Sequence, residues 1–369
     1  MSRFFLTTAI LTICNLTIFA QDKITDELKT LSDSKQYDKI IKEYSSKYKD
    51  YSAKSLYYVG LAYYMTEDDN NCIKFMNLST GKDAKDPAPH YIKASTLNYM
   101  GKYNEAIKSF QVAIDLRADD AKSYSGLGDS YNQLGEKELA LEAYKKATEQ
   151  EECPDRAYSM IAQIYSDLEE NDKALEAFYI AKSKISEKSD SYINALFNIG
   201  LLEYLNGNYD MGEAAFVELL QLDPEDYHSY AKLIQIYYSR KEYDKAKPYK
   251  EKLYEAHKKG KLEDNLKDMF CFDQFAWKDK LIMVFERYEN ENKGKIYNKH
   301  IFYVTDGNGN IEYTIQTEFS PISLELGGPK YLLCARKGGT HINYGVGFDD
   351  DFDYTDLKNT VIKQLEKQK

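Results

Sequence analysis

The stretch AKSYSGLGDSYNQLGEKELALEAYKKATEQEECP, residues 121–154, decides the fold, because most of the chain up to about residue 260 can be laid over it at a fixed offset. Counted from its first residue, its marker residues stand at positions 4, 7, 8, 11, 20, 24 and 27: Tyr124, Leu127, Gly128, Tyr131, Ala140, Tyr144 and Ala147. Small residues at positions 8 and 20 let two helices approach closely, and the aromatic residues fill the space toward the next unit. The pattern predicts a helix, a turn and a second helix.

The same marker residues recur in about seven units. Their expected bounds are 21–52, 53–86, 87–120, 121–154, 155–188, 193–226 and 227–260. Residues 189–192 interrupt the register. In the last unit, Lys241 replaces a turn glycine and Pro248 falls inside the second helix, so we expect that unit to be distorted or to act as a cap. Because each ring is buried mostly by a neighbouring unit, single units are not expected to fold alone.

This spacing resembles the tetratricopeptide repeat, whose signature has an aromatic, Leu-Gly, Tyr, then Ala, aromatic, Ala at these positions. The resemblance covers residues 21–260 and implies an all-α superhelix that binds a protein or peptide. It also implies that positions 2, 5, 9, 12 and 13 of each unit line a concave face. The candidate binding residues there are Tyr57, Tyr64, Tyr91, Tyr99, Asp129, Asn132, Gln133, Phe197, Tyr204 and Tyr238.

The expected groove is aromatic at both ends and polar in the middle. Such a face suits an extended peptide or a partner helix that offers apolar side chains between hydrogen-bonding groups. The lysine and asparagine pattern with which some relatives hold a terminal carboxylate is lacking. For each ring, the alternative is that it packs between repeats.

From about residue 261 the period changes to two, which is typical of strands. We expect strands near 281–289, 296–305, 310–319, 322–326, 330–336 and 341–348, and a closing helix from about Tyr354 through Leu365. Short connections imply an antiparallel sheet. The aromatic segment 270–277 is expected to dock these strands against the last repeat. The predicted fold class is therefore α+β, with a repeat solenoid over 21–260 and a small antiparallel β domain over 261–369 that resembles no family we recognise.

The N-terminus has the features of an export signal. Arg3 precedes an apolar run from Phe4 to Phe19, and a polar segment follows Ala20. The run is short for a bilayer, which needs roughly 20 residues, so a signal peptide over residues 1–20 is favoured over an uncleaved membrane anchor. The mature chain is then expected outside the cytoplasm, periplasmic or secreted, without a membrane span.

The amino-acid composition limits the kinds of partner that the chain can bind. The formal net charge is -11, and the sequence has no cluster of basic residues that could bind phosphates, so no nucleic acid partner is expected. The apolar share of 43% excludes general disorder, and the 34 tyrosines suit both helix packing and a binding groove.

The remaining chemical signals are weak. Cys72 is expected to be a buried thiol, while Cys271 and Cys334 could pair. The segment Asp306–Asn310 fits a hairpin turn better than a calcium loop. The acidic run from Asp349 to Asp356 fits either a solvated helix N-terminus or a surface cation site.

The spacing of His300, His341 and Cys334 builds no catalytic set. No catalytic residue, metal site or cofactor is therefore assigned. The sequence predicts an exported scaffold that binds protein or peptide, in the assembly of an envelope or secreted complex. The alternative is an enzyme or a small-ligand or cation receptor with its site in the C-terminal β domain.

Overall fold

The computed structural model describes residues 23–288, 298–306, 308–349 and 352–367. The expected signal peptide, the residues 289 and 296–297 of two expected strands, and Asp350 and Asp351 of the acidic run lie outside this part of the chain. Contacts divide the chain into two compact units, Met1–Tyr192 and Ile193–Lys369, named here the N-terminal and the C-terminal unit. The division falls where the sequence interrupts the repeat register. The end of the solenoid at residue 260 stays a prediction.

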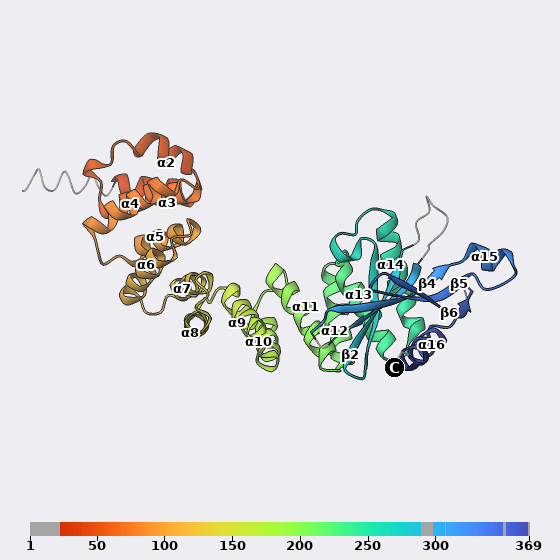
Figure 1. Cartoon of the computed structure of the whole chain (residues 1–369). Helices are drawn as coiled ribbons and strands as arrows, with labels where there is room; N and C mark the ends of the chain where they lie inside the picture. The colour runs from red at the N-terminus through yellow and green to blue at the C-terminus, as the bar shows by residue number, and fades with distance from the viewer. Residues whose placement is uncertain (1–22, 289–297, 307, 350–351, 368–369) are drawn as a thin grey trace, which may run out of the picture. The chain divides into compact units, whose positions relative to one another are not determined.

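Helices follow one another in pairs through the N-terminal unit (Figure 1). They are a helix over residues 23–33, α2 (Tyr37–Tyr44), α3 (Ala53–Met65), α4 (Asp69–Lys82), α5 (Pro87–Tyr99), α6 (Tyr103–Leu116), α7 (Ala121–Gln133), α8 (Lys137–Thr148), α9 (Asp155–Asp167) and α10 (Asn171–Lys184). A short 3-10 helix, Tyr48–Asp50, lies between α2 and α3. The pairs continue with α11 (Asp190–Leu205), α12 (Tyr209–Leu222), α13 (Tyr227–Ser239) and α14 (Tyr243–Lys258).

The turn inside each pair has one left-handed residue, always at position 15 of the unit. These residues are Lys35, Glu67, Gly101, Gly135, Glu169, Gly207 and Lys241, with φ between 56° and 80°. Glycine adopts this conformation without steric cost, whereas Lys and Glu do not. The turn is therefore kept without glycine in four of the seven units. Lys241 makes the same turn, and α14 continues past Pro248, so the distortion expected at the turn of the last unit is absent there.

The close approach of paired helices depends on small residues, as predicted. A Cβ added to Gly128 would lie 2.8 Å from the ring of Tyr144, and one added to Gly200 would lie 2.7 Å from Phe216. The residue at position 20 is fully buried in six units, where it is Ile40, Cys72, Ala106, Ala140, Ala174 or Ala246. The Cys72 thiol lies 3.1 Å from the hydroxyl of Thr96, so the expected buried thiol is confirmed.

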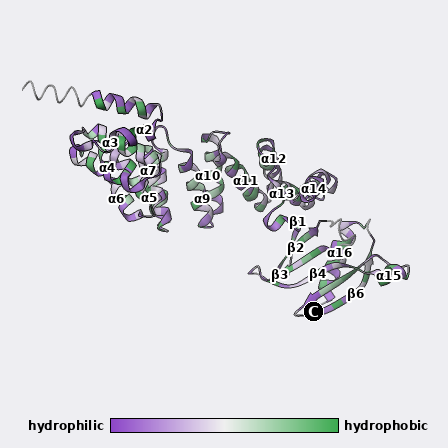
Figure 2. Cartoon of the chain, turned by 90° about the horizontal axis from the view of Figure 1, so that it is seen from above, coloured by the Kyte–Doolittle hydropathy of each residue, from purple (hydrophilic) through white to green (hydrophobic). Residues whose placement is uncertain are grey.

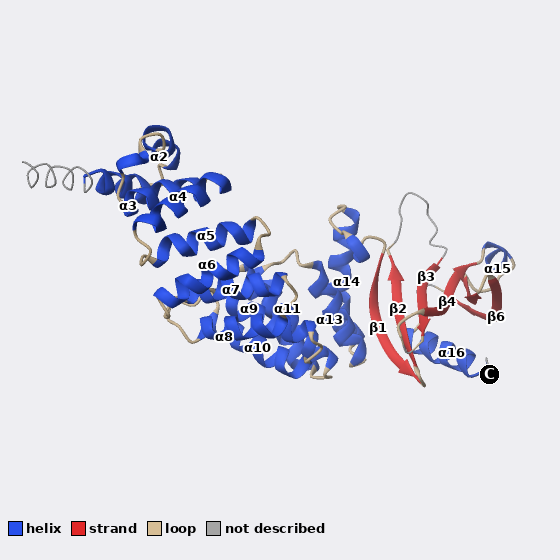
Figure 3. Ribbon diagram, turned by 60° about the vertical axis from the view of Figure 1, so that its left-hand side comes forward, coloured by secondary structure: helices blue, strands red, loops and turns tan. Residues whose placement is uncertain are grey.

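The C-terminal unit adds a six-stranded antiparallel sheet after its helices (Figure 3). Its strands follow chain order: β1 (Met269–Trp277), β2 (Lys280–Arg287), β3 (Asn298–Thr305), β4 (Ile311–Phe319), β5 (Tyr331–Lys337) and β6 (Thr340–Phe348). A 3-10 helix (Asp264–Leu266) precedes the sheet, α15 (Pro321–Glu325) connects β4 and β5, and α16 (Tyr354–Lys367) closes the unit. The predicted α+β class, with helical repeats followed by an antiparallel sheet and a helix, is confirmed.

Two details of the strand prediction were wrong. Residues 322–325 lie in helix α15, because Ser320 accepts a hydrogen bond from the backbone N–H of Ser323 and Pro321 stands in the first turn. The aromatic segment 270–277 is itself part of strand β1, although its expected docking against the last repeat is confirmed by the core that Phe270 and Phe272 share with that repeat. A bulge between Cys271 and Asp273 breaks its alternation, so the neighbours Phe272 and Asp273 are both buried and the period of two is hidden.

One hydrophobic core joins the last two repeats, the sheet and α16. It includes Phe216 and Leu233 from the helices, Phe302 and Leu333 from the sheet, and Val361 from α16. Two buried carboxylates fix the helices to the sheet. Glu286 of β2 lies 2.6 Å from the Lys250 ammonium of α14, and Asp273 of β1 lies 2.7 Å from the Lys358 ammonium of α16.

Each helix carries hydrophobic and hydrophilic residues together (Figure 2). Among the described residues, no helix combines the length and the apolar character that crossing a bilayer requires.

Candidate protein-binding site

The predicted concave-face residues of the N-terminal unit lie in different environments. Tyr64 and Tyr91 are half-buried, and both rings pack against the same hydrophobic cluster. Tyr57 lies beneath the Lys54 ammonium, 4.6 Å from its ring centroid, and burial raises its pKa to about 12. In contrast, Tyr99 is 75% exposed.

The polar middle of the predicted face is partly committed to internal contacts. Asp129 accepts hydrogen bonds from the Tyr144 hydroxyl at 2.6 Å and from the Arg156 guanidinium at 2.7 Å, which ties α7 to α8 and α9. Asn132 is half-buried and Gln133 is exposed.

In the C-terminal unit the predicted rings pack. Phe197 contacts Phe216, and Tyr204 is only 6% exposed. Tyr238 makes edge contacts with Phe272 of β1 and Tyr354 of α16, at 4.7 Å and 5.3 Å between ring centroids. The sheet therefore covers the end of α13 that carries Tyr238. Whether any of the ten predicted residues binds a partner stays a prediction.

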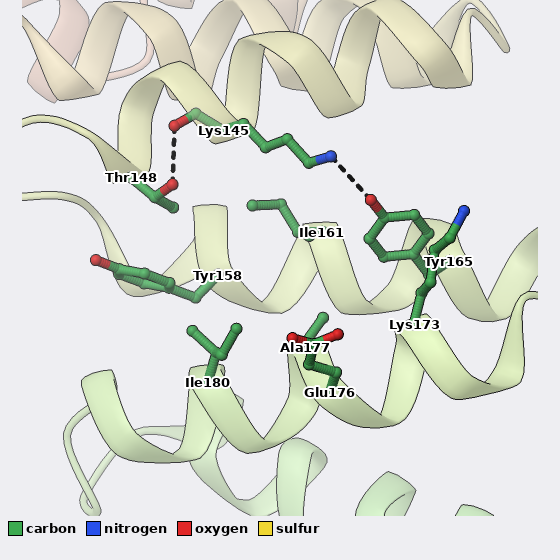
Figure 4. Close-up of a pocket in the computed structure, with 9 residues that line it drawn as sticks. All are labelled: Lys145, Thr148, Tyr158, Ile161, Tyr165, Lys173, Glu176, Ala177 and Ile180. Atoms are coloured by element: carbon green, nitrogen blue, oxygen red, sulfur yellow. Dashed lines mark hydrogen bonds between the residues drawn. The ribbon is translucent and has the colours of Figure 1, made fainter.

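A hollow of about 400 Å³ opens between α8, α9 and α10 of the N-terminal unit (Figure 4). Its nine lining residues are Lys145, Thr148, Tyr158, Ile161, Tyr165, Lys173, Glu176, Ala177 and Ile180. Ile161, Ala177 and Ile180 give it an apolar floor and wall, and Ile180 is 47% exposed. The volume is in the range of ligand-binding pockets, about 300–1,000 Å³.

The rim of this hollow carries two cations beside one ring. The Lys145 ammonium donates a hydrogen bond to the Tyr165 hydroxyl at 2.8 Å. Lys145 and Lys173 lie 5.4 Å and 5.5 Å from the Tyr165 ring centroid, so both make cation–π contacts. Glu176 stands on the same lining. The hollow thus offers apolar contact at its base and two ammonium groups at one edge.

A second hollow, of about 290 Å³, occupies the equivalent positions one unit earlier. Its nine lining residues are Gln111, Ile114, Tyr124, Leu127, Tyr131, Leu139, Glu142, Ala143 and Lys146. In unit numbering, both sets occupy positions 25 and 28 of one unit and 4, 7, 11, 19, 22, 23 and 26 of the next. The two hollows are the same feature built twice. We name them the paired hollows.

The paired hollows do not follow from the sequence pattern, which predicts that the aromatic residues at positions 4 and 11 pack between units. In these two units the four tyrosines at those positions remain half-buried. The available signal was the recurrence of Tyr at positions 4 and 11 of the first helices together with Glu at position 22 of the second helices.

The other residues that the sequence offered for a disulfide or a cation site have structural roles. Cys271 and Cys334 carry free thiols and lie on β1 and β5, with three strands between them, so they do not pair. Burial raises the pKa of both thiols to about 11. Asp306 accepts hydrogen bonds from the backbone N–H groups of Asn308 and Asn310 in the β3–β4 turn, which confirms the hairpin interpretation.

The described part of the acidic run also has structural partners. Asp353 accepts hydrogen bonds from the backbone N–H groups of Thr355 and Asp356 at the start of α16, as expected for an anion at a helix N-terminus. Asp349 accepts one from the backbone N–H of Lys330.

Three family models match the repeats. A model described as TPR repeat matches residues 94–135, and two described as tetratricopeptide repeat match 121–152 with 155–179, and 194–257. These segments are tetratricopeptide repeats. The tetratricopeptide architecture is that of a scaffold for protein–protein interaction. No family model matches residues 261–369, and no curated protein matches the chain.

Several solved structures share the repeat fold. The C-terminal part of a TPR repeat-containing protein from Cytophaga hutchinsonii is 20% identical, with a TM-score of 0.47, over 55% of this chain and 79% of that one. MamA from Desulfovibrio magneticus RS-1 is 17% identical, with a TM-score of 0.41, over 47% and 96%. YrrB, described as a TPR protein with an unusual peptide-binding site, is 19% identical, with a TM-score of 0.42, over 48% and 89%.

Proposed function

We propose that this protein is an exported scaffold that binds a segment of another protein along the paired hollows, in the assembly of an envelope or secreted complex. The observation that carries the proposal is the repetition of one hollow in consecutive units. A single surface depression arises readily by chance. Two depressions built from equivalent positions repeat two tyrosines and an apolar floor at a regular spacing, which suits a chain with regularly spaced side chains.

The lining defines the kind of segment. Ile161 and Leu127 at equivalent floor positions favour an apolar side chain in each hollow. Lys145 at the rim of the larger hollow favours a carboxylate beside the apolar residue, since charge complementarity orients a partner, whereas Lys173 is already paired with Glu170. The expected ligand is therefore a peptide with apolar residues flanked by Asp or Glu.

A displayed library of random peptides tests this proposal on the purified protein. Enriched peptides should combine apolar and acidic residues. Their affinity should fall at least about tenfold, or about 1.4 kcal/mol, in Ile180→Glu and in Lys145→Glu. Leu222→Glu is the matched control, because Leu222 is 43% exposed, close to Ile180, and lies on α12 away from the paired hollows.

Equal binding to the wild type and to both hollow variants would remove the paired hollows from the function. In that event the same peptides, tested on Tyr64→Ala and Tyr91→Ala, would show whether the predicted concave face binds them instead.

Export is supported by the Arg3-led apolar run at the N-terminus. Mass measurement of the protein recovered from a host with an envelope tests it. Cleavage after Ala20 is expected, and recovery of the intact chain from the cytoplasm would contradict export.

A second candidate function is a cation receptor in the C-terminal sheet. The observation that favours it is a cluster of three side chains with metal-binding atoms, Glu318, Cys334 and His341.

A further inference from the structure

Three neighbouring strands bring Glu318, Cys334 and His341 to one face of the sheet. Gln316 of β4 pairs with Cys334 of β5, and Arg336 of β5 pairs with His341 of β6. Since residues two apart on a strand share a face, Glu318 lies on the same face as Cys334, and Cys334 on the same face as His341. One carboxylate oxygen, the Cys334 sulfur and one imidazole nitrogen all lie within 4.8 Å of one another.

The two oxygens of Glu318 have different partners. Its Oε1 accepts hydrogen bonds from Arg336 Nε at 3.0 Å and from Gln316 Nε2 at 2.5 Å. Its Oε2 faces His341 Nε2 at 3.0 Å. The donors on Oε1 fix the carboxylate plane and leave Oε2 directed at the imidazole. Hydrogen bonds of this kind orient ligands in metal sites.

We propose that Glu318 Oε2, Cys334 Sγ and His341 Nε2 bind one Zn²⁺ ion in the C-terminal sheet. Three protein ligands with a water molecule in the fourth place complete a tetrahedron, with bonds of about 2.0–2.3 Å. On binding, the Cys334 thiol releases its proton to solvent and the sulfur ligates as thiolate.

The donor set selects the metal. Ca²⁺ and Mg²⁺ take oxygen ligands, so a thiol and an imidazole disfavour them. Zn²⁺ accepts sulfur, nitrogen and oxygen in one tetrahedral site. Glu318 and the Cys334 thiolate together carry two negative charges, and the Arg336 guanidinium, 2.9 Å from Glu318, offsets one of them. Access is from the side of His341, whose side chain is 48% exposed, whereas Cys334 is 2% exposed.

The competing role for these residues is a purely structural ion-pair network, in which Arg336 and His341 neutralise Glu318. Such a network needs no sulfur. Cys334 therefore separates the two roles, because it contributes a ligand to Zn²⁺ but no charge partner to Arg336.

Titration of the reduced, metal-stripped protein with Zn²⁺ in a calorimeter tests the site. One ion per chain is expected, with affinity reduced about tenfold or more in Cys334→Ser and in His341→Ala. The matched control is the double variant Cys153→Ser, His228→Ala, which removes a cysteine and an exposed histidine outside the cluster and should bind as the wild type does. Circular dichroism of each variant checks that it is folded.

Co²⁺ supplies a readout that an ion-pair network would not give. The wild type should show a thiolate-to-cobalt charge-transfer band that is absent in Cys334→Ser and present in the control. Absence of stoichiometric Zn²⁺ binding, equal weakening in the control and the ligand variants, or a cobalt complex without the thiolate band would each overturn the site. Peptide binding through the paired hollows does not enter this test.

Discussion

Gly128 determines how closely α7 approaches α8. A Cβ at this position would lie 2.8 Å from two ring carbons of Tyr144, a side chain that is fully buried. The ring cannot move outward without disturbing its hydrogen bond to Asp129.

The variant Gly128→Val should therefore lower the free energy of unfolding by about 1–3 kcal/mol, the usual cost of overpacking a core. Urea unfolding followed by helical circular dichroism measures the change. Gly81→Ala is the control, because Gly81 lies in α4 with no atom within 4 Å of an added Cβ. It should stabilise by about 0.5–1 kcal/mol, since alanine is the better helix former. Two equal effects would contradict the steric explanation.

Glu169 holds a left-handed conformation, with φ of 59°, where three other units have glycine. Replacing it by glycine removes this strain, so Glu169→Gly should raise the free energy of unfolding by about 1 kcal/mol. The midpoint of thermal unfolding should rise accordingly. The matched variant Glu142→Gly, on the exposed side of α8, should lose about 0.5–1 kcal/mol because it places glycine inside a helix. If both variants lose stability, the turn conformation carries no strain.

The left-handed residue in the turn of each unit can be predicted from the sequence in only some of the units. Gly101, Gly135 and Gly207 identify the left-handed position directly. Glu67 and Glu169 do not, because the conformation is imposed there by the packed helices on either side rather than by the residue in the turn.

Between elements, the contact of α14 with β2 depends on a buried ion pair. Glu286 is 3% exposed, and it accepts hydrogen bonds from the Lys250 ammonium and the Tyr254 hydroxyl. Burial alone would raise the pKa of Glu286, but the charge of Lys250 outweighs it and holds the pKa well below its usual range.

The variant Glu286→Gln should lower the stability of the C-terminal unit by about 3–5 kcal/mol at neutral pH, because it leaves the Lys250 ammonium buried without its partner. A lowered folded-state pKa contributes stability that is present above the unfolded value, about 4.3, and is lost as pH falls toward the folded value. The difference between wild type and variant should therefore shrink below about pH 4.

Trp277 on β1 is the single tryptophan of the chain and reports this unit by fluorescence during urea unfolding. The double variant Lys250→Met, Glu286→Gln should recover most of the loss at neutral pH. A difference independent of pH would show that the charge of Glu286 does not contribute.

A helix or strand could be predicted from the sequence where its hydrophobic pattern is complete within the element itself. The repeat helices follow from spacing within each unit, and β2 to β6 follow from alternation or from short apolar runs. Strand β1 could not be recognised because its bulge shifts the aromatic alternation by one residue between Phe272 and Phe275, and only the pairing partner on β2 reveals that shift. Residues 322–326 alternate like a strand, yet the cap at Ser320 starts a helix.

The candidate sites were still harder to predict. The paired hollows need the second helix of one unit beside both helices of the next, and the metal cluster needs three strands in register. Residues 318, 334 and 341 have no metal-ligand spacing in the sequence. Both sites are products of tertiary packing.

At the scale of the whole chain, the boundary between the N-terminal and the C-terminal unit places five of the seven expected repeats on one side and two on the other. The N-terminal unit ends at Tyr192, and the last two repeats belong with the sheet. Their shared core explains why. Tyr238 packs on Phe272, the Gln235 amide donates to the Cys271 carbonyl at 3.0 Å, and the core runs without interruption from α12 to α16.

A fragment of residues 193–369 should therefore fold alone, whereas a fragment of residues 261–369 should not. The shorter fragment exposes Phe270 and Phe272, which are fully buried in the chain, at a cost of about 1.5–3 kcal/mol for each ring. It also leaves Glu286 without Lys250. Trp277 fluorescence should give one cooperative urea transition in the longer fragment and none in the shorter. A cooperative transition in residues 261–369 would instead show that the sheet and α16 form a core of their own, and that the last repeat only rests on it.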